Sequence, residues 1–294
     1  MHLLMLTSSC DPNLKEEGFI SDWVIYLAKN VNKLTLLTLT KPTITLPSNV
    51  RSYVVSSNSK LGKLWEIWNI ILLEHKNHKM DGLFCNMYDF LGVAIGLISR
   101  LLSVKSIYWY AGGITVPFLS LTSISFLLNS IIATCSDQEK QRYHTMFKTS
   151  LSKIKVIGHG INKQRFVNKK DQRDKKYFTI GYCCRLSKSK NIESLLDLAN
   201  HDLKSNKPIK LLLALSKTFE NKPYLEYLQS KIKEINKTGK IKIKILTFIT
   251  YINNARFYKQ LDLYVHPSLQ TSIDKGRSGS SLFGDTCIVI KKRI

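Results

Sequence analysis

Cationic side chains follow a predicted strand at a spacing that suits an anionic ligand. The strand spans residues 177–183, and the segment Cys184-Arg185-Leu186-Ser187-Lys188-Ser189-Lys190-Asn191 leads from it into a helix predicted over 192–200. Arg185 and Lys190 would stand beside the amino end of that helix, where cations and the helix dipole together favour a diphosphate. The sequence has no G-x-G-x-x-G, P-loop, G-x-S-x-G or H-E-x-x-H motif, which argues against the chemistries that those motifs serve.

The pattern strand–x-R-L-x-x-x-K-x–helix resembles the G-R-L-x-x-x-K-G motif of retaining GT-B glycosyltransferases. Three further stretches are similar to that family in their order and spacing. They are Ser130–Ser136 (SIIATCS), Val156–Asn162 (VIGHGIN) with the following Arg165-Phe166, and Phe257–Ser268 (FYKQLDLYVHPS). The resemblance covers most of the chain.

This resemblance implies an enzyme that transfers a sugar, with retention, from a nucleotide-diphosphate sugar to a glycan or lipid-linked acceptor. Arg185 and Lys190 would be the catalytic cations, because they would hold the diphosphate while charge develops on it. The residues implied as donor-binding are Arg185, Lys190, His266, Ser268 and Asp274, and the candidate loop contacts are Gly18, Gly112 and His159. No D-x-D pair is present, so we expect neither a metal nor another cofactor.

The carboxylates of the family's donor site are not found in the expected register. Counted on from Pro267-Ser268, the two glutamates of the family's E-x7-E fall on Thr271 and Gly279. A shifted register brings in Asp274 but places Phe283 at the second position. The resemblance therefore leaves the activity of the chain open.

Two departures lie in the first half of the chain. Gly112, in Trp109-Tyr110-Ala111-Gly112-Gly113, stands where the family carries an active-site histidine, and Glu17 replaces the second glycine of a loop. Family members also continue beyond the position of Ile294, which predicts an incomplete second domain. Two hypotheses remain: a hexosyl-type glycosyltransferase, and an inactive or truncated homologue that retains nucleotide or glycan binding.

Short apolar runs alternate with helical patterns along the chain, which predicts βαβ units and parallel sheets. We expect strands at 2–8, 34–39, 52–56, 82–86, 106–110, 130–134, 155–157, 177–183, 209–215, 242–246 and 263–267. The predicted fold is α/β and, from the resemblance, GT-B, with two Rossmann-like domains facing across a cleft. An acceptor-side domain would span 1–165, a charged linker 166–176, and a donor domain 177–294.

Helices should connect these strands and cover the sheets. The apolar pattern predicts a helix over 61–78 with Trp65 and Trp68 in the core, and another after residue 18 with Trp23 and Tyr26 on its buried face. Ser136 with Glu139 has the spacing of a capping box. The uncharged segment 106–136 is interrupted by Gly, Pro and Asn, which favours buried strand–loop–helix–strand over a membrane span.

The composition indicates a folded, basic protein. The 294 residues carry 44 Lys+Arg against 21 Asp+Glu, a formal charge of +23, with 44% hydrophobic residues. Such a charge fits either lysine-rich solvated faces or an anionic partner. Nucleic acid is not the expected partner, because aromatic residues do not alternate with the lysine clusters. Scattered single cysteines and the lack of a secretory pattern indicate the cytoplasm, with peripheral contact to an anionic membrane and a role in cell-envelope glycan biosynthesis as further expectations.

Overall fold

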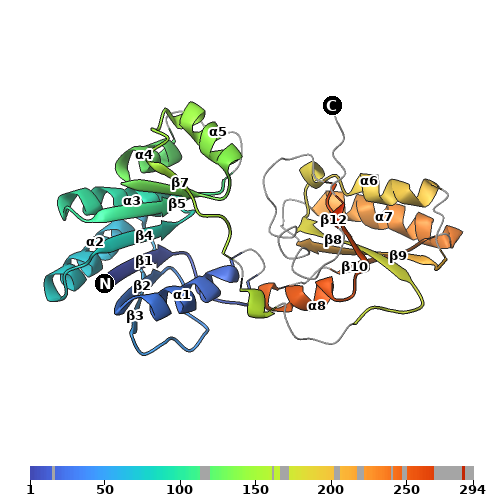
Figure 1. The fold of residues 1–294 in the computed structure, drawn as a ribbon, viewed down its shortest axis with the longest axis horizontal. Helices are drawn as coiled ribbons and strands as arrows, with labels where there is room; N and C mark the ends of the chain where they lie inside the picture. Colours follow the sequence, from blue (N-terminus) through green and yellow to red (C-terminus); the bar gives the residue numbers. More distant parts are fainter. Residues whose placement is uncertain are drawn as a thin grey trace. The chain divides into compact units, whose positions relative to one another are not determined.

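The computed structural model describes most of the chain as two compact units. Described are residues 1–14, 17–112, 120–160, 162–165, 172–201, 206–216, 222–239, 241–246, 250–267 and 287–288. The first unit contains Met1–Pro12 and Glu17–Gly160, and the second contains Asn13–Glu16 and the chain from Ile161 onward. Each unit is an α/β layer structure built on a parallel sheet (Figure 1).

The first unit has a seven-stranded sheet in the described part of the chain, with the order β3-β2-β1-β4-β5-β6-β7, and every strand pair in it is parallel. The strands are β1 (His2–Thr7), β2 (Lys33–Thr38), β3 (Val50–Val54), β4 (Gly82–Asn86), β5 (Lys105–Trp109), β6 (Ile131–Thr134) and β7 (Ile154–Val156). The helices are α1 (Phe19–Asn30), α2 (Lys60–Asn77), α3 (Asp89–Leu101), α4 (Leu121–Leu128) and α5 (Asp137–Phe147). All seven predicted strands are confirmed to within a few residues.

The second unit has a sheet of the order β10-β9-β8-β11-β12 among its described residues, again with parallel pairs. Its strands are β8 (Phe178–Arg185), β9 (Ile209–Ser216), β10 (Ile241–Leu246), β11 (Leu263–Val265) and β12 (Cys287–Ile288). The helices are α6 (Glu193–Leu196), α7 (Lys222–Thr238) and α8 (Asn254–Tyr258), with 3-10 turns at Lys163–Arg165, Lys188–Lys190, Asp197–Asn200 and Tyr251–Asn253. The predicted α/β fold is confirmed in both units.

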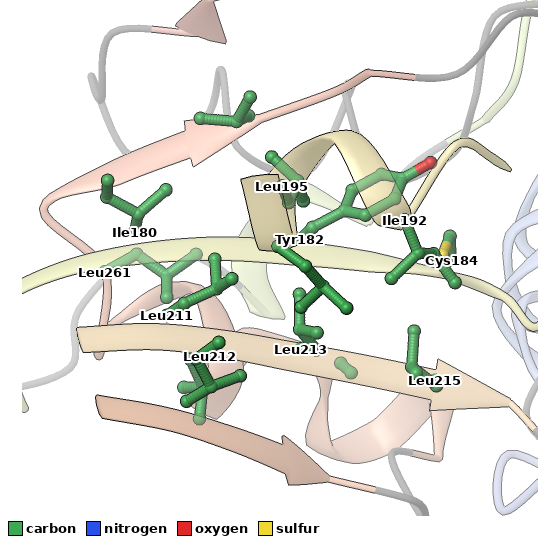
Figure 2. Packing of buried hydrophobic residues seen from close by; sticks show 14 of the residues in the cluster. Ile180, Tyr182, Cys184, Ile192, Leu195, Leu211, Leu212, Leu213, Leu215 and Leu261 are labelled. Carbon is green, nitrogen blue, oxygen red and sulfur yellow. The ribbon is translucent and has the colours of Figure 1, made fainter. Parts of the chain in front are cut away.

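Apolar strands and helices form a separate core in each unit. In the first unit, one cluster joins α2, α3, α4 and α5 to a single face of the sheet. On the other face, Trp23 of α1 packs edge-on against Trp109, with 5.0 Å between ring centroids. In the second unit, Figure 2 shows alternating residues of β8 and β9 packed beside the start of α6, namely Ile180, Tyr182, Cys184, Leu211, Leu213, Leu215, Ile192 and Leu195.

The predicted buried faces of α1 and α2 were partly wrong. Tyr26 is exposed, and Trp65 keeps 68% of its surface accessible. The residues of α2 that are buried are Ile67, Ile71 and Glu74. The helix is turned so that Glu74, rather than Trp65, faces the sheet, because the Glu74 carboxylate binds the cations Lys33 and Arg51 there.

The strand order places one switch point in each sheet. The chain winds outward from β1 through β2 to β3, then returns to start β4 on the other side of β1. In the second sheet, β8 and β11 are neighbours in the same way. Ligands of parallel α/β sheets bind outside the carboxyl ends of the strands at such points, so the two switch points define where a site is expected.

Candidate functional site

The cationic segment predicted from the sequence lies at the carboxyl end of β8. Arg185 is the last residue of that strand and its side chain is exposed. Lys190 ends the following 3-10 turn and is only 6% exposed, which is unusual for a lysine. One cation at this edge is therefore open to solvent, and the other is held inside the loop.

Tyr182 ties Lys190 to the residues that follow β11. Its hydroxyl donates a hydrogen bond to the backbone oxygen of Lys190 at 3.1 Å. On its other side the Tyr182 ring meets His266 edge-on, with 5.5 Å between ring centroids. His266 is buried and also lies nearly parallel to the ring of Tyr264. Lys190 and His266, which are far apart in the sequence, are thus both fixed around one buried tyrosine.

Asn191 makes a second link across the switch point. Its backbone is left-handed, with φ of 51°, and its side-chain Nδ2 donates to the backbone oxygen of Pro267 at 3.3 Å. Asparagine adopts this conformation more readily than most residues do. The loop after β8 and the segment after β11 are therefore joined by a direct hydrogen bond.

The helix expected directly after this loop is shorter than predicted. A 3-10 turn comes first, and α6 spans only Glu193–Leu196 before a second 3-10 turn. Four residues add little to a helix dipole, so the positive charge of this edge comes from Arg185, Lys188 and Lys190.

A hydrogen bond joins α6 to α7. Tyr224 of α7 donates to Glu193 at 2.6 Å, and burial and then this hydrogen bond raise the pKa of Tyr224. That contact holds α6 against α7.

Two of the expected donor-binding residues cannot be placed. Ser268 and Asp274 lie outside the residues that the structure describes, as do Thr271, Gly279 and Phe283. Of the residues predicted to bind the donor, Arg185, Lys190 and His266 are described, and Asn191 and Tyr182, which no motif position predicts, support them.

At the switch point of the first sheet, three hydroxyl groups converge on Glu17. Ser8 and Ser9 follow β1, and both donate to Oε2 of Glu17, Ser9 at 3.3 Å. Tyr88 follows β4 and its hydroxyl donates to Oε1 at 3.1 Å. The half-buried Glu17 carboxylate thus sits between the carboxyl ends of β1 and β4. The sequence pattern predicts a glycine at position 17 and gives no sign that Glu17 has these partners.

The candidate loop contacts of the first unit occupy different positions at this edge. Gly18 directly follows Glu17 and precedes the first residue of α1. The His159 ring packs edge-on against Trp109, with centroids 5.4 Å apart. The backbone oxygen of Gly112 accepts hydrogen bonds from Arg142 at 3.1 Å and from Tyr143 at 3.3 Å.

The packing around Gly112 leaves no space for a side chain at this position. A Cβ atom at this position would lie 2.2 Å from Cζ and the hydroxyl oxygen of Tyr110. The Tyr110 ring is buried and packs against Phe126 and Tyr143, so it would have to move to admit any side chain there. Glycine at 112 and tyrosine at 110 are therefore a matched pair in this chain.

Within the described ranges, no three His, Cys, Asp or Glu side chains come together in a way that could hold a metal ion. Among the helices that the structure describes, none combines the length and the apolar character needed to cross a membrane.

The two parallel-sheet units, each with a switch point, form the GT-B fold, which is the fold of the matching solved structures. The solved structures that match include HepE from Anabaena, in complex with UDP and glucose. It is 15% identical with a TM-score of 0.73, and the match covers 98% of this chain and 80% of that one. Sucrose-phosphate synthase from Thermosynechococcus elongatus is 14% identical with a TM-score of 0.74, covering 98% and 81%. A glycosyltransferase from Rickettsia africae is 14% identical with a TM-score of 0.71, covering 98% and 79%. No family model and no curated protein matches the sequence.

Proposed function

We propose that this chain is a retaining glycosyltransferase that moves a hexosyl group from a nucleotide-diphosphate sugar to a glycan or lipid-linked acceptor. The observation that carries the proposal is the second switch point, where Lys190 and His266 are fixed around Tyr182 beside the exposed Arg185. A buried lysine next to an open arginine suits a diphosphate, whose two phosphates can be bound at different depths. The structure of Anabaena HepE with UDP and glucose, which has the same fold, supports this choice of donor.

In this proposal the cations act on the leaving group. Negative charge grows on the diphosphate as the bond to the sugar breaks, and Arg185 with Lys190 would stabilise that charge through preorganised hydrogen bonds. They would serve in place of a metal, so no cofactor is required. His266, Ser268 and Asp274 remain the proposed contacts to the rest of the donor.

Donor binding can be tested by calorimetry with UDP and with GDP. Each charge-assisted hydrogen bond contributes about 1.5–3 kcal/mol, so Arg185→Ala with Lys190→Ala should weaken binding at least about 100-fold. Tyr182 contacts the backbone oxygen of Lys190, so the change Lys190→Ala leaves that hydrogen bond in place. The matched control is Lys242→Ala with Lys244→Ala, which removes the same charge from two exposed lysines of β10. Equal affinity of the site variant and the wild type would exclude the diphosphate assignment.

We propose that Glu17 binds the acceptor substrate. The Glu17 carboxylate lies between β1 and β4 and already accepts hydrogen bonds from hydroxyl groups. It is therefore suited to accept a hydrogen bond from a sugar hydroxyl as well. Glu17→Gln keeps the shape but lowers the strength of each accepted hydrogen bond. We expect a raised KM for the acceptor with unchanged UDP affinity. A fall in UDP affinity instead would contradict the acceptor role.

The alternative of an inactive homologue is favoured by one observation, the Gly112–Tyr110 packing that leaves no room for the family's histidine. It predicts nucleotide binding without turnover. Release of UDP or GDP from the matching nucleotide-sugar above a catalyst-free control would reject this alternative. We further propose a role in cell-envelope glycan synthesis, at a cytoplasmic location with peripheral membrane contact.

A further inference from the structure

Helix α4 buries Phe126 in the core of the first unit but carries a second, aliphatic stripe on its outer side. Its residues Thr122 and Ser125 are polar and buried, whereas Leu121, Ile124 and Leu127 are exposed. Surface helices ordinarily turn their apolar stripe toward the core. The outer stripe of α4 is therefore not explained by packing within the first unit.

The inner, polar stripe has its partners on α3. Thr122 donates to Oδ2 of Asp89 at 2.7 Å, and Ser125 donates to the backbone oxygen of Asp89 at 2.8 Å. Asn129, just beyond α4, donates to the backbone oxygen of Gly92 at 2.9 Å. A Cβ at Gly92 would lie 2.7 Å from the Ser125 hydroxyl, so the glycine allows this close approach. These polar contacts and the buried Phe126 thus attach α4, while Leu121 and Leu127 stay exposed.

Helix α3, which packs against α4, also carries two exposed leucines four residues apart. Leu97 follows Gly96, which lies against Leu128, and Leu101 follows Arg100, which contacts the end of α4. Leu101 and Leu127 are 72% and 67% exposed. We name the group Leu97, Leu101, Leu121, Ile124 and Leu127 the α3–α4 face. Clustered exposed aliphatic residues of this kind mark an interaction surface rather than a solvated one.

Two cations border this face, and neither forms an ion pair within the described part of the chain. Arg100 donates to the backbone oxygens of Leu127 and Leu128, at 2.9 and 3.1 Å, and Lys153 donates to those of Phe126 and Leu127, at 2.6 and 2.9 Å. Burial and then the charge of Arg100 lower the pKa of Lys153. Residues 90–136 contain no Asp or Glu. Two like charges crowd one helix end, and an anion beside them would relieve their repulsion.

We propose that the α3–α4 face docks this protein on an anionic lipid bilayer. The aliphatic side chains enter the boundary between headgroups and acyl chains, and Arg100 and Lys153 bind lipid phosphates. The inference rests on the proposed function in one respect, because a lipid-linked acceptor would be presented in such a bilayer. It depends on different residues from donor binding, so the two can fail separately.

Vesicle co-sedimentation tests the proposal with a matched pair of variants. Ile124→Glu places a charge on the face, and Ile252→Glu makes the same change at an isoleucine of similar exposure in the second unit, 41% against 46%. The vesicles are equal parts phosphatidylcholine and phosphatidylglycerol, with phosphatidylcholine alone as the neutral comparison. Because both positions are exposed, far-UV circular dichroism and the unfolding midpoint should match the wild type in each variant.

We expect wild type and Ile252→Glu to bind the anionic vesicles with the same affinity. The affinity of Ile124→Glu should be lower by at least about tenfold. Binding to neutral vesicles should be weaker for all three. Failure of the wild type to bind, or equal binding by Ile124→Glu, overturns the proposal. A third outcome also overturns it. If, without lipid, wild type and Ile252→Glu sediment as dimers and Ile124→Glu as a monomer, then the face joins two copies of this chain. UDP calorimetry on the same samples separates this outcome from failure of the proposed function.

Discussion

Replacing Glu74 by glutamine should destabilise the first unit more than any other single change of charge to amide on α2. The Glu74 carboxylate is fully buried, yet it accepts hydrogen bonds from Lys33 at 2.8 Å and Tyr53 at 2.6 Å and pairs with Arg51 at 3.0 Å. Burial alone would raise its pKa, but the bonds from Lys33 and Tyr53 outweigh burial and lower the pKa to about 2. Glutamine would keep the shape and leave two cations facing a neutral amide.

The magnitude follows from this pKa. A fall from 4.5 to about 2 corresponds to about 3 kcal/mol of stability at neutral pH. Lys33 and Arg51 are 24% and 57% exposed, so solvent screening reduces our expectation to about 2 kcal/mol. A depressed carboxyl pKa stabilises the fold above the unfolded value of 4.5, and this stabilisation is lost as the pH falls toward 2.

Tryptophan fluorescence makes the measurement specific. All four tryptophans, Trp23, Trp65, Trp68 and Trp109, belong to the first unit, so urea unfolding followed by their emission reports that unit alone. Glu74→Gln should lower the free energy of unfolding at about pH 7 and flatten its decline between about pH 5 and pH 3.

The control is Glu66→Gln on the same helix, where the carboxylate accepts bonds from the backbone amides of Ser56 and Ser57. An amide oxygen can accept the same bonds, so this loss should stay below about 1 kcal/mol. A Glu74→Gln variant as stable as Glu66→Gln, or one with the pH dependence of the wild type, would refute the reasoning.

Three further changes test local features of the two units. Gly181→Ala would place a Cβ 2.3 Å from the buried Leu261, so overpacking should cost the second unit about 1–3 kcal/mol, measurable by urea unfolding followed by far-UV circular dichroism. Ser136 caps α5 by accepting from the backbone N–H of Glu139 at 3.2 Å, and Ser136→Ala should lower the stability seen by tryptophan emission by about 1 kcal/mol. Burial raises the pKa of the Cys10 thiol to about 11. Peptide mapping after iodoacetamide treatment at about pH 8 should therefore find Cys10 at least about 100-fold slower to react than an exposed cysteine, until the first unit unfolds.

The strands were predictable because both faces of a parallel sheet are covered, which makes each strand a short apolar run. The phase of α2 was not. A hydrophobic pattern counts Trp65 as core and Glu74 as surface, whereas charge pairing with Lys33 and Arg51 buries the glutamate and turns the tryptophan outward. The hydrophobic pattern of a helix does not show which charged side chains lie on the sheet beneath it.

The candidate site was predictable where its residues are close in the sequence and hidden where they are not. Arg185 and Lys190 stand in one motif, but the bond from Asn191 to Pro267 joins positions that no local pattern relates. Glu17 and Tyr88 meet only because β1 and β4 are neighbours in the sheet. The strand order, rather than any motif, brings them together.

That strand order also has a consequence for how the protein is made. The strand pair at each switch point joins Leu3 to Gly82 and Ile180 to Leu263, so about 80 residues of chain separate the partners. On the ribosome, β1 can pair with β2 and β3 well before β4 has been synthesised, and β8 with β9 and β10 well before β11. Each switch point therefore forms only after the three strands on one side of it have been synthesised. A nascent chain that holds only β1–β3, or in the second unit only β8–β10, still lacks the strand that completes the switch point.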